Sequence, residues 1–200
     1  VENSAATACL LARALEIGGL DAEAVEIVRV DAGDHEQAFR SGEVDALATF
    51  EPIRTRLLDS ATELFDSTRI PGEIVDVLVA RREALDRHRR GLQQLLRAWF
   101  AALQILESEP ERAHRTMAPY TELSAEEFAR ALDGVRFPSL AENCAAMADD
   151  GKALRASTAR LNDLMREHGL LTRRVSLEQL YDDRILQTLG CPDAAAGAPR

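Results

Sequence analysis

Long apolar runs are missing from this chain of 200 residues, and none approaches the ~20 residues that a transmembrane helix requires. An excess of positive charge is also missing, because 34 Asp and Glu residues against 24 Lys and Arg leave a net charge of −10. Nucleic acids and anionic membranes attract proteins that carry a basic surface. The composition therefore argues against both of them as partners.

Cysteine is scarce, and its three positions follow no familiar pattern. Cys9, Cys144 and Cys191 are far apart, odd in number and outside any C-x-x-C spacing. This argues against a disulfide framework and against a zinc site of the usual spacing. Cys9 and Cys144 lie in alanine-rich stretches, where we expect them to be small buried hydrophobic residues.

Signatures of catalysis are absent from the sequence as well. It contains no P-loop, no G-x-G-x-x-G, no G-x-S-x-G and no H-E-x-x-H. We interpret the histidines, which are scattered over polar stretches, as surface residues rather than bases or metal ligands. The sequence therefore predicts no catalytic residue, no metal site and no cofactor. The histidines are His35, His88, His114 and His168.

Apolar residues at helical spacing predict several helices. Residues 4–17 form an amphipathic helix that Asn3 or Ser4 caps. Residues 90–108 carry one apolar stripe, and Trp99 on that stripe is expected in the core. Further helices are predicted at 34–41, 52–60, 110–118 (starting at Pro110), 124–133 (starting with the capping box Ser124-x-x-Glu127) and 151–168.

Four short segments have the alternation or apolar content of strands. Because they alternate with helices over the first 80 residues, they predict an α/β fold with a parallel core and right-handed crossovers. The predicted strands are 25–31, 44–50, 63–68 and 74–81.

The amino-terminal end favours an origin in a longer protein. The chain starts without Met or a signal peptide, and its first helix follows only three residues. A capped helix in an α/β fold normally follows a strand, so Val1 and Glu2 are expected to be the end of one. We therefore expect this chain to be the carboxy-terminal part of a longer protein.

Two corners between a predicted strand and a helix are candidate binding positions, since open parallel sheets bind ligands at the carboxyl ends of their strands. At Ser4–Thr7, small residues and free helix N–H groups suit an anion or a polar oxygen, although plain helix capping explains the same pattern. At the second corner, Glu51 stands before Pro52. Glutamate is a poor cap, so its carboxylate is expected to have a partner.

Several stretches taken together resemble one family. "SGEVDALATFEP", "LFDSTRIPGEIVDVLVAR" and "LLRAWFAALQILESEPERA", followed by "GVRFPSLAEN" and "ARLNDLMREHGLL", are similar to the substrate-binding proteins of nitrate/sulfonate/taurine-type ABC importers, a group described as NMT1/THI5-like. The resemblance extends from Val1 to about Leu189. It corresponds to the carboxy-terminal two-thirds of that family.

The resemblance implies a two-lobed fold of the periplasmic-binding-protein type 2 class. Each lobe is then a three-layer α/β sandwich with a parallel-rich sheet, followed by a mostly helical carboxy-terminal part. Residues 1–70 form most of the second lobe, residues 71–190 form the hinge crossover and the rest of the first lobe, and 191–200 form a disordered tail. The ligand-binding residues carried over from the family are Ser4, Ala5, Ala6, Thr7, Thr49, Phe50 (where the family often has Trp), Glu51 and, as a weaker candidate, Glu73.

The function implied by the resemblance is capture of a small polar solute for delivery to an ABC permease. The protein is then periplasmic, or anchored to the membrane outside the cytoplasm, with its signal segment outside this chain. Ser4 is expected to hold an anionic or carbonyl group and Glu51 a donor or cation, which favours an amine-bearing or heterocyclic solute. Two alternatives are a ligand-sensing receptor domain and an enzyme similar to thiamine-pyrimidine synthases, which needs a reactive His and a Cys-rich stretch that this sequence does not show.

Overall fold

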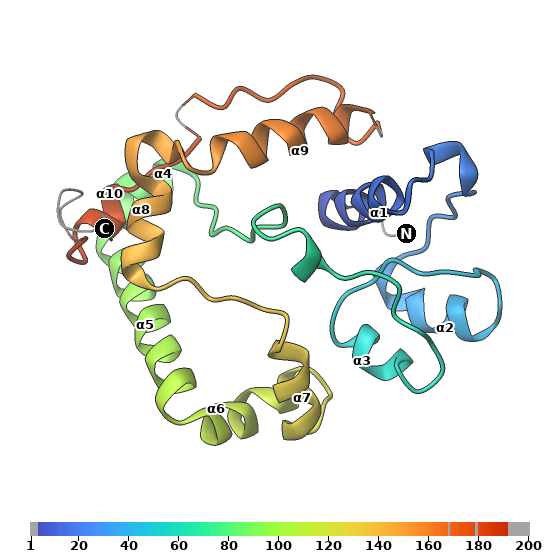
Figure 1. Ribbon diagram of the computed structural model, residues 1–200. Coiled ribbons are helices and arrows are strands. Elements are labelled where there is room, and N and C mark those ends of the chain that lie inside the picture. Colours follow the sequence, from blue (N-terminus) through green and yellow to red (C-terminus); the bar gives the residue numbers. More distant parts are fainter. Residues whose placement is uncertain (1–3, 168, 179, 192–200) are drawn as a thin grey trace, which may run out of the picture. The chain divides into compact units, whose positions relative to one another are not determined.

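Helices are the only regular elements in the part of the chain that the structure describes, which is residues 4–167, 169–178 and 180–191 of a computed structural model (Figure 1). The chain divides into two units, each built from three stretches of sequence. Unit 1 comprises Val1–Val75, Met117–Val135 and Ala159–Val175, and unit 2 comprises Asp76–Thr116, Arg136–Thr158 and Ser176–Arg200.

Unit 1 contains three amino-terminal helices, one later helix and most of α9. The apolar cluster of this unit lies around α7, where Phe128 is 6% exposed and packs with Leu123 and Ala131. The elements are α1 (Ala5–Gly18), α2 (His35–Arg40), α3 (Ile53–Leu57), α7 (Ala125–Leu132) and α9 (Arg155–Glu167), with the 3-10 turns η1 (Ala22–Ala24), η2 (Ala32–Asp34), η3 (Ser67–Arg69) and η4 (Ala118–Tyr120).

Unit 2 is formed by longer amphipathic helices and a short carboxy-terminal one. Contacts join α10 to both α5 and α8, and α4 to α5. The elements are α4 (Arg82–Arg87), α5 (Arg89–Ser108), α6 (Pro110–Met117, whose last residue falls in unit 1), α8 (Leu140–Gly151) and α10 (Arg184–Gln187).

Capping residues and prolines in the sequence predicted most of the helix starts correctly. Ser4 is the cap of α1, and Gly19 ends that helix with a left-handed φ of 68°. The predicted starts at Pro110 and at the capping box of Ser124 and Glu127 are both confirmed. Asn3, Val1 and Glu2 lie outside the described residues.

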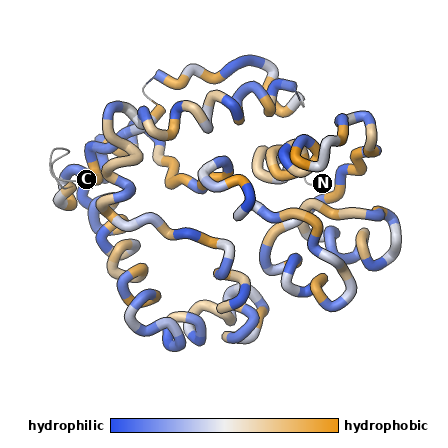
Figure 2. The backbone as a smooth tube through the Cα atoms, viewed as in Figure 1, coloured by the Kyte–Doolittle hydropathy of each residue, from blue (hydrophilic) through white to orange (hydrophobic). Residues whose placement is uncertain are grey.

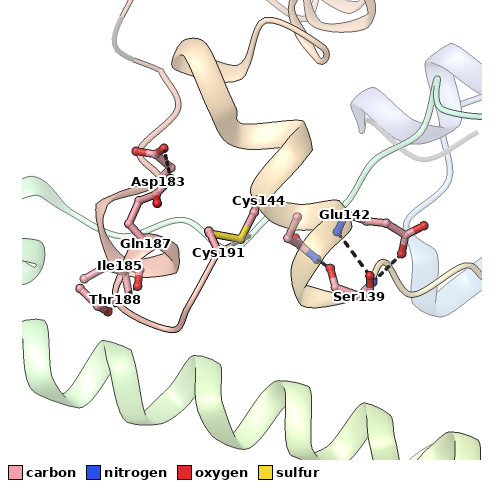
Figure 3. The surroundings of a disulfide bond; sticks show 9 residues. Ser139, Glu142, Cys144, Asp183, Ile185, Gln187, Thr188 and Cys191 are labelled. Carbon is pink, nitrogen blue, oxygen red and sulfur yellow. Dashed lines mark hydrogen bonds between the residues drawn. A yellow bond between two sulfur atoms is a disulfide. The ribbon is translucent and has the colours of Figure 1, made fainter. Parts of the chain in front are cut away.

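The stretch around Cys144 was expected to be helical, but the bounds of helix α8 were not predicted, although a capping box precedes it. The Ser139 side chain accepts a hydrogen bond from the Glu142 N–H at 3.3 Å, and the Glu142 carboxylate accepts one from the Ser139 N–H at 2.7 Å (Figure 3). This is a second capping box. Reading S-x-x-E at 139–142 would have located the helix.

The prediction that Trp99 belongs to a core was wrong. Helix α5 confirms the predicted range, yet none of its residues is buried, and the Trp99 side chain is 47% exposed. Its ring meets that of Phe137 edge to face, with 6.1 Å between centroids. An apolar stripe gives the direction of burial but not the amount of surface that neighbouring elements cover.

The predicted α/β fold with a parallel-rich sheet is contradicted. Within the described ranges no residue is assigned to a strand, and 25–31, 44–50 and 74–81 are irregular. The predicted strand 63–68 ends in the 3-10 turn η3. The apolar pattern is real, because the segment between η3 and α4 is largely hydrophobic (Figure 2) and Val79 is 82% exposed. Such a pattern describes one strand only, whereas a sheet also requires a backbone partner in register.

The cysteine prediction was also wrong in part. Cys144 and Cys191 form a disulfide with a Cα–Cα distance of 5.6 Å (Figure 3). Cys144 is buried, as expected, but as half of a disulfide that joins α8 to the segment after α10. Cys9 is a free buried thiol, which confirms its prediction. The rest of the predicted tail, 192–200, lies outside the described residues.

Candidate functional site

The first predicted corner has the geometry of a capped helix start. The Ser4 hydroxyl accepts from the Thr7 N–H at 3.4 Å, and the two hydroxyl oxygens lie 2.9 Å apart. Thr7 is 2% exposed, whereas Ala6 is exposed. In the described structure the N–H groups of Ala5 and Ala6 have no protein acceptor. Capping therefore accounts for Ser4 and Thr7 and leaves two N–H groups available at the start of α1.

The second corner supplies Glu51 with partners from its own chain. One carboxylate oxygen accepts from Arg54 Nη1 at 2.9 Å and the other from the Thr55 N–H at 3.1 Å. The peptide bond to Pro52 is cis, and α3 begins one residue after the proline. Glu51 thus caps a short helix through its side chain. The expectation that this carboxylate has a partner is met within the protein, and its contact with a solute stays a prediction.

Arg54 was missed by sequence reasoning, although its position three residues after Glu51 is the spacing of a helical ion pair. Its guanidinium also donates to the Glu63 carboxylate, and this hydrogen bond is the largest cause that raises the Arg54 pKa, ahead of the bond to Glu51. Two carboxylates therefore share one guanidinium. The corner keeps a net charge of −1 (two negative groups and one positive).

His35 organises the same corner, and the prediction that it is a surface residue was wrong. Its side chain is 0% exposed. Nε2 lies 3.2 Å from the Val30 carbonyl oxygen and Nδ1 lies 3.0 Å from Thr49 Oγ1. Because a carbonyl only accepts, Nε2 donates to it, and in the neutral ring Nδ1 then accepts from the Thr49 hydroxyl. The ring also meets Phe50 edge to face, with 6.1 Å between centroids.

The third candidate, Glu73, lies between two guanidinium groups. Arg13 Nε of α1 is 3.0 Å from one of its carboxylate oxygens, and Arg160 Nη1 of α9 is 3.4 Å from the other. The side chains of Arg13 and Glu73 are 17% and 18% exposed. Burial raises the pKa of the nearby Cys9 thiol, and the Glu73 charge raises it further. These contacts give Glu73 a structural role that joins α1 to α9.

The predicted residues therefore fall into three local groups in unit 1. Arg13 links the helix capped by Ser4 to Glu73, whereas no hydrogen bond or ion pair among the described residues joins Ser4 to Glu51. The described part of the chain also contains no cluster of three or more His, Cys, Asp or Glu suited to a metal ion. None of its helices is both long and apolar enough to span a bilayer.

A comparison with models of known families shows to which family the chain belongs. Residues 2–120, more than half of the chain, match the model of the NMT1-like family, and the chain belongs to that family. The match includes every candidate residue from Ser4 to Glu73 and confirms the NMT1/THI5-like part of the resemblance. No match to the chain is found among curated proteins or among solved structures.

Proposed function

We propose that this chain is the solute-binding component of an ABC importer, which captures a small polar solute and delivers it to a membrane permease. The observation that carries this proposal is membership of the NMT1-like family, over a range that contains every candidate binding residue. The stretches similar to nitrate/sulfonate/taurine-type binding proteins support the importer class.

The charges at the two corners favour a solute with two different ends. The N–H groups of Ala5 and Ala6 suit an anionic or carbonyl group. The net negative corner of Glu51, Arg54 and Glu63 suits a cation or a hydrogen-bond donor. Phe50 is 43% exposed beside Glu51, so an aromatic residue is accessible to a heterocycle or an amine at this corner. An amine-bearing or heterocyclic solute therefore fits better than a simple oxyanion.

A thermal-shift panel of amino-sulfonates, pyrimidines, polyamines and simple oxyanions tests this function on the intact protein. A solute at 100 times its dissociation constant stabilises a protein by about 2.7 kcal/mol, which is a clear shift in Tm. Glu51→Gln should weaken binding of the solute that produces the shift. Glu63→Gln removes the other partner of Arg54 and one negative charge of the corner, and it should weaken binding less than Glu51→Gln because the Glu51 carboxylate stays in place.

The Tm of each ligand-free variant separates loss of binding from loss of the Glu51 cap. If Glu51→Gln left the affinity for every solute unchanged, Glu51 would not be a binding residue. If no member of the panel shifted the Tm of the intact protein, the importer function would lose its support.

We also propose that the protein acts outside the cytoplasm. The disulfide of Cys144 and Cys191 supports this location, because disulfides persist in oxidising compartments such as the periplasm and are rare in the cytosol. Thiol alkylation in denaturant, which exposes buried Cys9, of protein taken directly from intact cells tests the location when it is followed by mass measurement. One alkylated cysteine is expected, at Cys9, and three would contradict it.

A further inference from the structure

The carboxy-terminal segment of unit 2, from Tyr181 to Cys191, lies against the earlier helices of that unit, and we name it the clasp. It is attached at three places in chain order, which are Tyr181, the helix α10 and Cys191. Figure 3 shows the last two, with Ile185 and Thr188 on the side of α10 near α5 and Cys191 against α8. Each attachment has a different physical basis.

The first attachment is contact between an aromatic ring and a glycine. Gly151 at the end of α8 is buried and has a left-handed φ of 67°. A Cβ at this position would overlap the Tyr181 ring, so only glycine lets the ring approach so closely. The Tyr181 hydroxyl is hydrogen-bonded to the Thr158 hydroxyl. Tyr181 therefore holds the start of the clasp to α8 and α9.

The second attachment is the helix α10, which has only four residues. A single helical turn is unstable in isolation, so α10 depends on what it packs against. Ile185 and Leu186 are each 7% exposed, and α10 contacts α5 and α8. Gln93 Nε2 of α5 donates to Thr188 Oγ1 at 3.0 Å, just beyond the helix. Two apolar side chains and a few surface hydrogen bonds are a small non-covalent attachment.

The third attachment is the disulfide, which is covalent and lies just beyond α10. Cys144 is 5% exposed in α8, whereas Cys191 is only half-buried. The disulfide links residues 47 positions apart and keeps α10 at a high effective concentration next to α5 and α8. Once it opens, the end of the clasp has no other covalent tie to these helices within the described residues.

We propose that the Cys144–Cys191 disulfide is a redox-sensitive lock on the clasp, and that its reduction separates α10 from α5 and α8. The reductant is a dithiol. Its first thiolate attacks one cysteine sulfur, the Cys144–Cys191 bond breaks and a mixed disulfide forms. Its second thiol then displaces the other cysteine and closes the disulfide of the reductant. Two electrons and two protons finish on the thiols of Cys144 and Cys191.

The lock acts within unit 2 and does not depend on the identity of the solute. Unit 1 contains only Cys9, a buried thiol far from the clasp in sequence, whose pKa is raised by burial and so resists thiolate chemistry. Reduction is therefore expected to change the exchange of backbone amides in the clasp and to leave α1 and α2 as they are.

Hydrogen–deuterium exchange on the full chain tests the lock, with dithiothreitol as the dithiol. Amides at 184–188 should exchange at least tenfold faster after reduction, and their protection should return after reoxidation. Cys144→Ser and Cys191→Ser should show the fast rate without reductant. Cys9→Ser is the matched control and should behave like the natural sequence.

Reversible reduction of the natural sequence keeps the test valid even if a serine variant fails to fold. Equal protection of 184–188 in the oxidised and reduced chains would overturn the proposal. So would equal loss of protection in α1 and α2 on reduction, because the effect would then be global unfolding. Intact mass showing three free thiols after oxidation would overturn it as well.

Discussion

The two units hold their irregular segments by different means. In unit 1, buried polar side chains bind backbone groups: His35 reaches the Val30 carbonyl, and Asn162, 6% exposed, bonds both the N–H and the C=O of Val175 at 3.1 and 2.7 Å. In unit 2, a disulfide and the Tyr181 ring hold the clasp. Backbone groups taken from water need partners, and side chains supply them where no strand lies alongside. Unit 1 should therefore be sensitive to single polar substitutions, and unit 2 to its redox state.

The largest expected effect is in unit 2. Cys144→Ser removes a covalent link across 47 residues, and loop-closure entropy gives a loss of about 4 kcal/mol in the free energy of unfolding. Urea denaturation under oxidising conditions measures this loss. Under reducing conditions the variant and the natural sequence should agree. A variant as stable as the natural sequence under oxidising conditions would mean that the disulfide does not constrain the unfolded chain.

The second largest loss in the free energy of unfolding is expected in unit 1. His35→Ala leaves a cavity and removes the partners of the Val30 carbonyl and the Thr49 hydroxyl, so we expect a loss of about 3 kcal/mol. Thr49→Val removes only one of these bonds and should cost about 1 kcal/mol. Exposed His88→Ala is the control, with a change within about 0.5 kcal/mol. Equal effects at His35 and His88 would show that the polar contacts of unit 1 do not carry its stability.

The distance in sequence between interacting residues also explains which features could be predicted from the sequence and which could not. Ser4, Pro110 and the Ser124 capping box act within one helical turn, so their helices were predicted from neighbouring residues. Arg54 beside Glu51 was equally visible at a spacing of three and was overlooked. Side-chain pattern alone fixes neither a strand's partner nor the contact between His35 and Thr49, which are 14 residues apart. For that reason the sheet prediction failed, and His35 was placed on the surface.

The smallest expected effect is a pH dependence at the capping box, a motif that both units contain. In α7 of unit 1 and α8 of unit 2, hydrogen bonds from the Ser124 and Ser139 N–H groups hold the pKa of the Glu127 and Glu142 carboxyls below their ordinary value. A carboxyl whose pKa is lower in the folded state stabilises above its unfolded pKa, and this stability is lost as pH falls through the folded value. Amide exchange at the starts of α7 and α8 should therefore increase as pH is lowered from about 4.5, after correction for intrinsic rates.

Glu127→Gln and Glu142→Gln isolate this effect from Asp66 and Asp182, whose pKa values are also lowered, by Thr68 and Arg184 respectively. Each variant should remove the pH dependence at its own helix and leave the other helix unchanged, since the two boxes share no residue. If amide exchange at α7 still depended on pH in Glu127→Gln, groups other than the Glu127 carboxyl would cause that dependence. Glu142→Gln could abolish the pH dependence of amide exchange at α8 while Glu127→Gln leaves that at α7 unchanged. That result would show that the wider polar network of unit 1, rather than local capping, governs its helix starts.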